Sequence, residues 1–142
     1  MRTVQKEEIQ RVIVKRPMTS YKGDFGRLLL IGGTYPYGGA IIMAALAAVH
    51  SGAGLVTVAT DPDNLTALHS HLPEAMGFDL ADHELLCEQV QKASVILVGP
   101  GLKESNENQG VLQIIFEQVS RHQVLILDGG AISLFATSQF DL

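Results

Sequence analysis

The chain has 142 residues, the length of one domain, and 46% of them are hydrophobic while only 18% are charged. Fifteen acidic and ten basic side chains give a formal net charge of -5 without a prominent cluster of Lys and Arg, which excludes a typical nucleic-acid-binding protein. The single cysteine, Cys87, excludes an internal disulfide framework. The longest apolar run is about half of a membrane span, and the N-terminus has no apolar signal core. We therefore expect a folded cytoplasmic protein with neither a membrane nor a nucleic acid as partner.

Short segments rich in Val, Ile and Leu predict four β-strands. They cover residues 27–33, 54–60, 94–101 and 124–130. Three of the four are nearly continuous apolar runs, without the alternation of a strand that has one face in water. That pattern is typical of parallel strands covered on both faces.

Helical patterns separate these strands and predict an α/β fold. The predicted helices cover residues 39–51, 61–72, 80–93 and 106–122. Pro62 suits the first turn of the second helix, and Asp82 can cap the third. Because strands and helices alternate, we expect an open, mostly parallel sheet with right-handed crossovers and helices on both faces.

The C-terminal end departs from this pattern. We expect no closing helix after the fourth strand, so that the sheet keeps an unprotected edge and an apolar tail is exposed. The apolar residues of this tail are Leu134, Phe135, Phe140 and Leu142. The sequence therefore predicts that residues 1–142 are the first half of a larger domain.

The segment GRLLLIGGTYPYGGA, residues 26–40, joins a strand to a helix through two pairs of glycines. Such a loop presents backbone N–H groups and the positive end of a helix to an anion, and glycine lets a ligand approach the backbone. Its spacing matches neither the G-x-G-x-x-G fingerprint nor the phosphate loop. However, Asp61 stands just past the second strand, where a dinucleotide fold has its ribose-binding acid. Both a ligand-binding loop and tight packing of helix on strand stay open here.

Two further strands end in glycine turns, one in VGPGL (98–102) and one in Asp128 followed by two glycines. Ligands of open α/β sheets gather beyond the carboxyl ends of the strands, so these loops predict a shared site if they meet at that edge. Asp128 either reaches a metal, a hydroxyl or a loop N–H, or only caps the next turn. His69 and His71 are two residues apart, a spacing that cannot chelate one ion from a helix, so we expect no metal site of histidines.

Five stretches together carry a family resemblance: YKGDFGRLLLIGGTYPYGGA, AALAAVHSGAGLVTVAT, LPEAM, ILVGPGL and VLILDGGAI, between Tyr21 and Ile132. In this order they resemble the N-terminal half of the ADP/ATP-dependent NAD(P)H-hydrate dehydratases, of the ribokinase-like superfamily. The resemblance implies a three-layer α/β/α domain and a repair enzyme for nicotinamide nucleotides. In this family the terminal phosphate of ADP or ATP passes to the hydroxyl of the S epimer of hydrated NADH or NADPH, and loss of phosphate restores the double bond. Mg²⁺ would shield the phosphate charges.

The same resemblance implies roles for five residues. Ala40 and Gly101 match the family residues that contact the hydrated dinucleotide. Gly39 and Gly99 are their neighbours and shape the two loops. Asp128 matches the first acid of an LDADAL-like stretch in the family.

Three positions depart from the family pattern. Gly130 replaces the second acid of the LDADAL-like stretch, which puts any role of that position in doubt. Lys103 replaces the glycine after GPGL, so that a ligand approaches the backbone less freely there. Tyr21 stands where many members have His before KGDFG.

The rest of the family's machinery has no counterpart in the 142 residues. The catalytic Asp in a GTGD-like helix start and the ADP/ATP-binding residues belong to the C-terminal half of the ribokinase-like domain. We therefore expect residues 1–142 to be the N-terminal half of a single ribokinase-like domain, inactive alone and carrying the hydrated-dinucleotide side of the site. The missing half would follow in a longer chain or come as a second polypeptide, and the resemblance also implies a homo-oligomer.

Two other functions stay open from the sequence. A vitamin-precursor kinase of the same superfamily shares the sheet and the lost Asp, although GPGL and PEAM argue against it. A non-catalytic dinucleotide-binding module would use the glycine loop and Asp61 to bind unmodified NAD.

Overall fold

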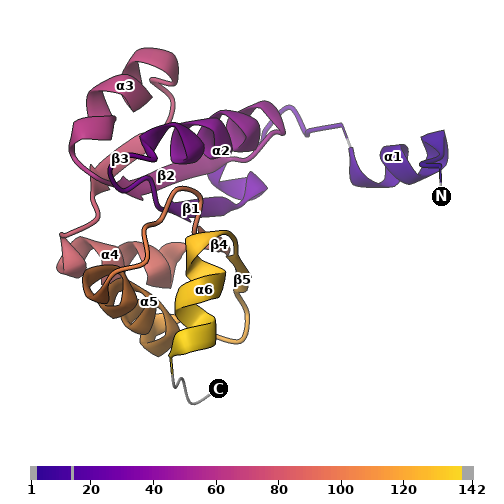
Figure 1. The fold of residues 1–142 in the computed structure, drawn as a ribbon. Coiled ribbons are helices and arrows are strands. Elements are labelled where there is room, and N and C mark those ends of the chain that lie inside the picture. Colours follow the sequence, from indigo (N-terminus) through magenta and orange to yellow (C-terminus); the bar gives the residue numbers. More distant parts are fainter. Residues whose placement is uncertain (1–2, 14, 139–142) are drawn as a thin grey trace.

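Five parallel strands form the centre of the structure, a computed structural model that describes residues 3–13 and 15–138 (Figure 1). The strands are β1 (Arg27–Ile31), β2 (Leu55–Thr60), β3 (Met76–Asp79), β4 (Val95–Val98) and β5 (Val124–Leu127). They lie in the order β3-β2-β1-β4-β5, and every neighbouring pair is parallel. The predicted open parallel sheet is therefore confirmed.

The central strand β1 explains why its sequence is apolar without alternation. Leu30 pairs with Val58 of β2 on one side and with Leu97 of β4 on the other. Successive side chains of a strand point to opposite faces. Leu30 belongs to the core on one face of the sheet, whereas Leu29 and Ile31 belong to the core on the other. Both faces of β1 are buried, so each position must be apolar.

Helices cover both faces of the sheet, so that the body has three layers, helix, sheet and helix. They are α1 (Lys6–Val12), α2 (Gly38–His50), α3 (Asp63–His71), α4 (His83–Lys92), α5 (Asn106–Gln118) and α6 (Gly130–Thr137), with a short 3₁₀ turn at Lys22–Phe25. The helices α2 and α3 share one core with the sheet, and α4, α5 and α6 share the other. In Figure 1, α1 lies apart from this body. No helix in the described ranges is long and apolar enough to cross a membrane.

Two predicted helix starts are confirmed. Pro62 directly precedes the first residue of α3, and the side chain of Asp82 accepts a hydrogen bond from the backbone N–H of Leu85 at 3.0 Å. Such a cap satisfies a donor that would otherwise have no partner in the first turn.

Two elements differ from the sequence-based expectation. The strand β3 has only four residues and begins at Met76, the last residue of LPEAM, which the sequence suggests to be a loop; Phe78 at its third position is buried and anchors it. The second difference is α6, where we expected no closing helix. Leu134 is only 5% exposed, and Phe135 stacks on Phe116 of α5 with 5.5 Å between ring centroids.

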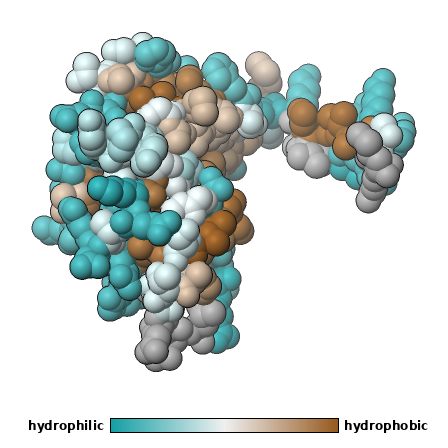
Figure 2. All heavy atoms as spheres, viewed as in Figure 1, coloured by the Kyte–Doolittle hydropathy of each residue, from teal (hydrophilic) through white to brown (hydrophobic). Residues whose placement is uncertain are grey.

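The expectation of an exposed apolar tail was thus wrong for Leu134 and Phe135, because α6 folds back onto α5. Phe140 and Leu142 lie outside the described residues. The expected unprotected edge of the sheet is present at β5, which pairs with β4 alone among the described strands. Val124 is 54% exposed and Ile126 45%, and Figure 2 shows hydrophobic side chains at the margin of the body where β5 lies in Figure 1.

The strand order contains one reversal. From β1 the chain moves to β2 and β3 on one side, and it then crosses to β4 and β5 on the other side of β1. The reversal point therefore lies between β1 and β4. In open α/β sheets, the crevice outside the carboxyl ends of the strands at such a point is the usual ligand site.

Candidate functional site

The two glycine loops meet at this reversal point. The N–H of Gly33, after β1, donates to the carbonyl oxygen of Pro100, after β4, at 2.9 Å. The N–H of Thr34 donates to the carbonyl oxygen of Gly101, also at 2.9 Å, and the Thr34 hydroxyl reaches the same oxygen at 3.2 Å. The Thr34 hydroxyl oxygen accepts in turn from the N–H of Lys103 at 2.7 Å. Four contacts thus lock the loops together.

Ala40 and Gly101 lie against each other, as a shared site requires. A β-carbon built on Gly101 would lie 3.2 Å from the β-carbon of Ala40 and would overlap the carbonyl oxygen of Tyr37. Gly101 has a φ of +66°, a conformation that favours glycine. Only a residue without a side chain therefore allows this approach of the two loops.

Gly39 and Gly101 each carry a free backbone donor. Within the described part of the chain, neither of their N–H groups has a hydrogen-bond partner, whereas the N–H of Ala40 donates to the carbonyl oxygen of Tyr37 at 3.2 Å. Nothing lies within 4 Å of a β-carbon built on Gly39, in the first turn of α2. The arrangement offers two N–H groups and the positive end of a helix on one side of the loop contact.

Gly99 and Asp128 extend the same edge toward β5. A β-carbon on Gly99, whose φ is +127°, would overlap the carbonyl oxygen of Asp128. The N–H of Asp128 donates to the carbonyl oxygen of Val98 at 2.9 Å. Its exposed carboxylate has no hydrogen bond or ion pair with the described residues, so it does not cap α6. Gly99 brings the two backbones together, and the Asp128 side chain is left in solvent.

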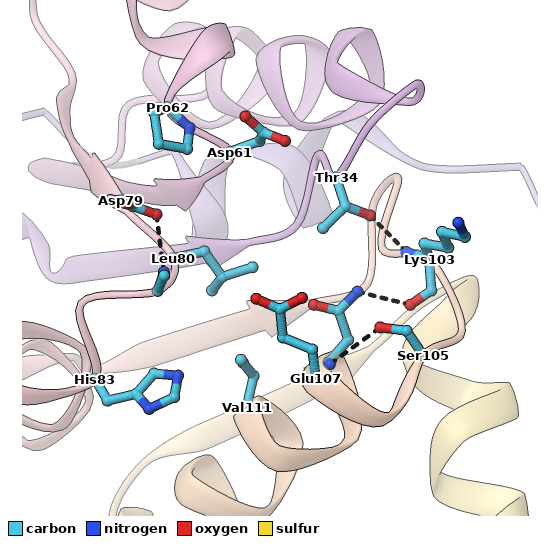
Figure 3. A pocket seen from close by; sticks show the side chains of 12 residues that line it. Thr34, Asp61, Pro62, Asp79, Leu80, His83, Lys103, Ser105, Glu107 and Val111 are labelled. Atoms are coloured by element: carbon cyan, nitrogen blue, oxygen red, sulfur yellow. Dashed lines mark hydrogen bonds between the residues drawn. The ribbon is translucent and has the colours of Figure 1, made fainter.

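A cavity of about 380 Å³ opens on the other side of the locked loops (Figure 3). It lies at the carboxyl ends of β1 to β4 and against the first turns of α4 and α5. Its lining residues are Thr34, Asp61, Pro62, Asp79, Leu80, Ala81, His83, Lys103, Ser105, Glu107, Asn108 and Val111. None of the five candidate residues belongs to this lining, but Thr34 and Lys103 come from the same two loops.

Sequence reasoning missed most of this cavity. Asp61 was singled out because it follows a predicted strand. Asp79 is the last residue of the unpredicted strand β3, and Glu107 and Asn108 stand in the first turn of a helix that the sequence suggests to be only amphipathic. The available signal was Ser105, whose hydroxyl caps α5 by accepting from the N–H of Asn108 at 3.2 Å.

The described residues hold no group of three or more His, Cys, Asp or Glu side chains that is placed to bind a metal ion. His69 and His71 are both exposed on α3. They therefore offer no metal site together with other ligands in the described ranges.

Two departures from the family pattern have a local explanation. Gly130 packs so closely on the carbonyl oxygen of Leu102 that a β-carbon there would overlap it. Lys103 is exposed, and its backbone is engaged on both sides: its N–H donates to Thr34, and its carbonyl oxygen accepts from the Asn108 amide at 2.8 Å. The structure gives no account of Tyr21 beyond its N–H, which donates to the Asp24 carboxylate at 3.0 Å.

The sequence of the chain matches those of known proteins. The sequence profile of the NAD(P)H-hydrate dehydratase family matches residues 28–141. The chain is 55% identical over 136 residues to the ADP-dependent (S)-NAD(P)H-hydrate dehydratase of Streptococcus pneumoniae, a match that covers 96% of this chain and 47% of that protein. The chain spans about half the length of the curated relatives it matches.

Solved structures agree with the sequence match. A ribokinase-like superfamily protein from Enterococcus faecalis superposes with a TM-score of 0.93 at 46% identity, over 98% of this chain and 49% of the other. An ADP/ATP-dependent NAD(P)H-hydrate dehydratase from Bacillus subtilis, co-crystallised with ATP and Mg²⁺, superposes with a TM-score of 0.72 at 25% identity, over 89% of this chain and 45% of the other. These matches confirm the resemblance and the ribokinase-like fold, and they do not favour a vitamin-precursor kinase or a non-catalytic module. The chain belongs to the NAD(P)H-hydrate dehydratase family.

Proposed function

We propose that this chain supplies the hydrated-dinucleotide side of an enzyme that dehydrates the S epimer of hydrated NADH or NADPH, with ADP or ATP as phosphoryl donor. The observation that carries the proposal is the contact between Ala40 and Gly101 at the reversal point of the sheet. The free N–H groups of Gly39 and Gly101 on the two touching loops suit an anionic or carbonyl-bearing ligand.

The chemistry explains why such an enzyme consumes a nucleotide. Hydroxide is a poor leaving group, and phosphate is a good one. Transfer of the terminal phosphoryl group to the ring hydroxyl forms a new P–O bond and breaks the one in the donor. Cleavage of the ring C–O bond then releases phosphate, and loss of a proton from the neighbouring carbon restores the double bond. The chain's part is to hold the hydrated ring in line with the donor, and positioning is the main source of rate in phosphoryl transfer.

We assign the donor nucleotide, its Mg²⁺ and the catalytic Asp to the half of the domain that this chain does not contain. The described residues provide no metal-ligand set of their own. Among the five candidate residues, Asp128 is the one that we expect to face that half. Its carboxylate is exposed, has no partner among the described residues and lies next to the edge strand β5.

We place the junction with the other half at β5. This strand lies at the edge of the sheet and exposes Val124 and Ile126, although an edge strand in water normally carries charged or polar side chains there. A further parallel strand beside β5, with its covering helix, would bury both. Residues 1–142 are then the N-terminal half of a single domain, whether the other half follows in the same chain or is a second polypeptide.

A cytoplasmic homo-oligomer completes the proposal. The exposed apolar side chains around α1 support it, because Val4, Ile9 and Ile13 lie on a segment that is apart from the body of the protein. A second copy would give this segment a surface to pack on.

The test is a chimera that joins this chain to the second half of the Streptococcus pneumoniae relative. With the S epimer of hydrated NADH and ADP, we expect the chimera to restore the absorbance of the reduced nicotinamide and the 142-residue chain to give none. The intact relative is the positive control, and the R epimer is the negative control. A folded chimera, verified by circular dichroism, that leaves the S epimer unchanged would falsify the proposed function.

A further inference from the structure

Asn64, in the first turn of α3, holds the loop that follows β1. Its Nδ2 donates to the carbonyl oxygen of Gly33, and also to the hydroxyl oxygen of Thr60 at 2.9 Å. The Thr60 hydroxyl donates to the same carbonyl oxygen at 3.3 Å, and Thr60 is fully buried at the end of β2. No backbone N–H in the described ranges reaches this carbonyl oxygen, so the two side chains supply its hydrogen bonds.

The other end of the same amide touches the beginning of α2. A β-carbon built on Gly38, the first residue of this helix, would overlap Oδ1 of Asn64. The carbonyl oxygen of Gly33 can only accept, which fixes the nitrogen of the amide on that side and its oxygen on the side of Gly38. Tyr37, at the N-cap of α2, gives the first turn no side-chain hydrogen bond. An amide oxygen from α3 therefore lies beside the positive end of a helix that has no side-chain cap of its own.

The Asn64 amide thus connects both ends of the glycine loop. The N–H of Gly33 is bound to the loop after β4 through Pro100, and its carbonyl oxygen is bound to α3 through Asn64. Gly38 directly precedes Gly39, which carries one of the two free donors of the candidate site. A shift of the Asn64 amide would therefore move the beginning of α2 and change the direction of the Gly39 N–H.

We propose that Asn64 is a positioning residue of this enzyme, which sets the direction of the Gly39 N–H toward the hydrated dinucleotide without touching that ligand. The inference rests on the proposed function, because it takes Gly39 to bind the dinucleotide. A donor that is fixed before the ligand arrives binds more tightly than one that the ligand must order. Loss of the Asn64 contacts should therefore weaken the binding of the hydrated dinucleotide and spare that of ADP, which we assign to the other half of the domain.

The test is Asn64→Asp in the chimera with the second half of the Streptococcus pneumoniae relative. The substitution keeps the shape of the side chain but turns a carboxylate oxygen toward the carbonyl oxygen of Gly33, so that two acceptors face each other without a proton. We expect the KM for the S epimer of hydrated NADH to rise about tenfold, with kcat nearly unchanged and the KM for ADP changed by less than about twofold. Equal rises of both KM values, or no rise in a folded variant, would overturn the inference.

Leu68→Val is the matched control for stability. Leu68 is fully buried on the same helix, so the shorter side chain should destabilise α3 without changing the contacts of Asn64. The ratio of the two KM values should then equal that of the wild-type chimera. If Leu68→Val raises the KM for the hydrated dinucleotide alone, as Asn64→Asp is expected to do, a general loosening of α3 explains the effect and the inference fails.

A measurement on the wild-type chain decides the question if Asn64→Asp does not fold. In ¹⁵N NMR spectra, the side-chain amide signals of Asn64 should shift as the S epimer of hydrated NADH saturates the backbone signal of Gly39. The side-chain amide of Gln91, which donates to Gln118 among the helices on the other face of the sheet, is the internal control and should stay in place. Asn64 signals that do not move at saturation would overturn the inference.

The wild-type chimera separates this inference from the proposed function. If it turns over the S epimer and Asn64→Asp leaves both KM values unchanged, the inference alone is overturned and the dehydratase stands. A folded wild-type chimera without turnover would contradict the proposed function and the inference with it.

Discussion

Gly39 and Gly101 lie on the two touching loops, and yet an added methyl group should act differently on them. A β-carbon at Gly101 would overlap the carbonyl oxygen of Tyr37 and adopt a positive φ, whereas nothing lies within 4 Å of one at Gly39. Gly101→Ala should lower the free energy of unfolding by about 1–3 kcal/mol. Gly39→Ala should leave it unchanged or raise it by up to about 1 kcal/mol, as expected at a helical position.

Urea unfolding of the two variants measures this difference. If Gly39→Ala keeps the stability but weakens binding of the hydrated dinucleotide, the open space above Gly39 is used by the ligand. Equal losses of stability at both positions would contradict the loop contact that the structure shows.

Thr34 connects the loops through its hydroxyl, which donates to the carbonyl oxygen of Gly101 and accepts from the N–H of Lys103. Thr34→Val removes both hydrogen bonds and should cost about 1–3 kcal/mol of unfolding free energy. Thr34→Ser retains the hydroxyl and should recover most of that loss in the same thermal or urea experiment. If Ser is no better than Val, the hydroxyl does not hold the loops together.

At the residue scale, the sequence predicted the loops but not the cavity beside them. The glycine turns were recognisable because strands ended in them. Glu107 and Asn108 were not, since their place in the cavity depends on how the first turn of α5 lies relative to the ends of β2 and β3, which no local pattern encodes. Asp61 was visible because a strand end fixes its place at the edge of the sheet.

At the scale of elements, the long apolar strands and the amphipathic helices could be predicted, and the short elements could not. The strand β3 has four residues and contains a glycine, so its sequence has no period to detect. It forms because Phe78 and Leu80 bury their side chains beside β2. The helix α6 follows β5, but no second predicted strand comes after it to mark it as a crossover helix, and it is held by packing on α5.

The packing of α6 gives a direct test. Leu134 is 5% exposed and belongs to the core, whereas Ile132, two positions earlier, is 53% exposed. Leu134→Ala should lower the free energy of unfolding by about 2–4 kcal/mol, and Ile132→Ala by less than about 1 kcal/mol. Chemical denaturation measures both, and a small loss at Leu134 would mean that α6 is not docked.

At the scale of the whole molecule, the edge strand β5 should decide whether the chain can assemble with the other half. Ile126→Glu places a charge on the exposed face of β5 and should cost the isolated chain little. It should prevent a separately produced second half of the Streptococcus pneumoniae relative from binding, because a charge would be buried in the new interface.

Met76→Glu is the matched control, since Met76 is exposed on β3 at the opposite edge of the sheet. Co-purification of the two halves should survive Met76→Glu and fail with Ile126→Glu. The opposite pattern would place the junction at β3.

The most direct measurement is the ¹⁵N NMR footprint of the S epimer of hydrated NADH on this chain, because the account depends on the strand-end loops being where the damaged dinucleotide binds. The predicted result is that the backbone signals of Gly39, Ala40 and Gly101 shift together and saturate with one affinity. Shifts confined to other surfaces, or no shifts at a concentration that saturates the chimera, would contradict it.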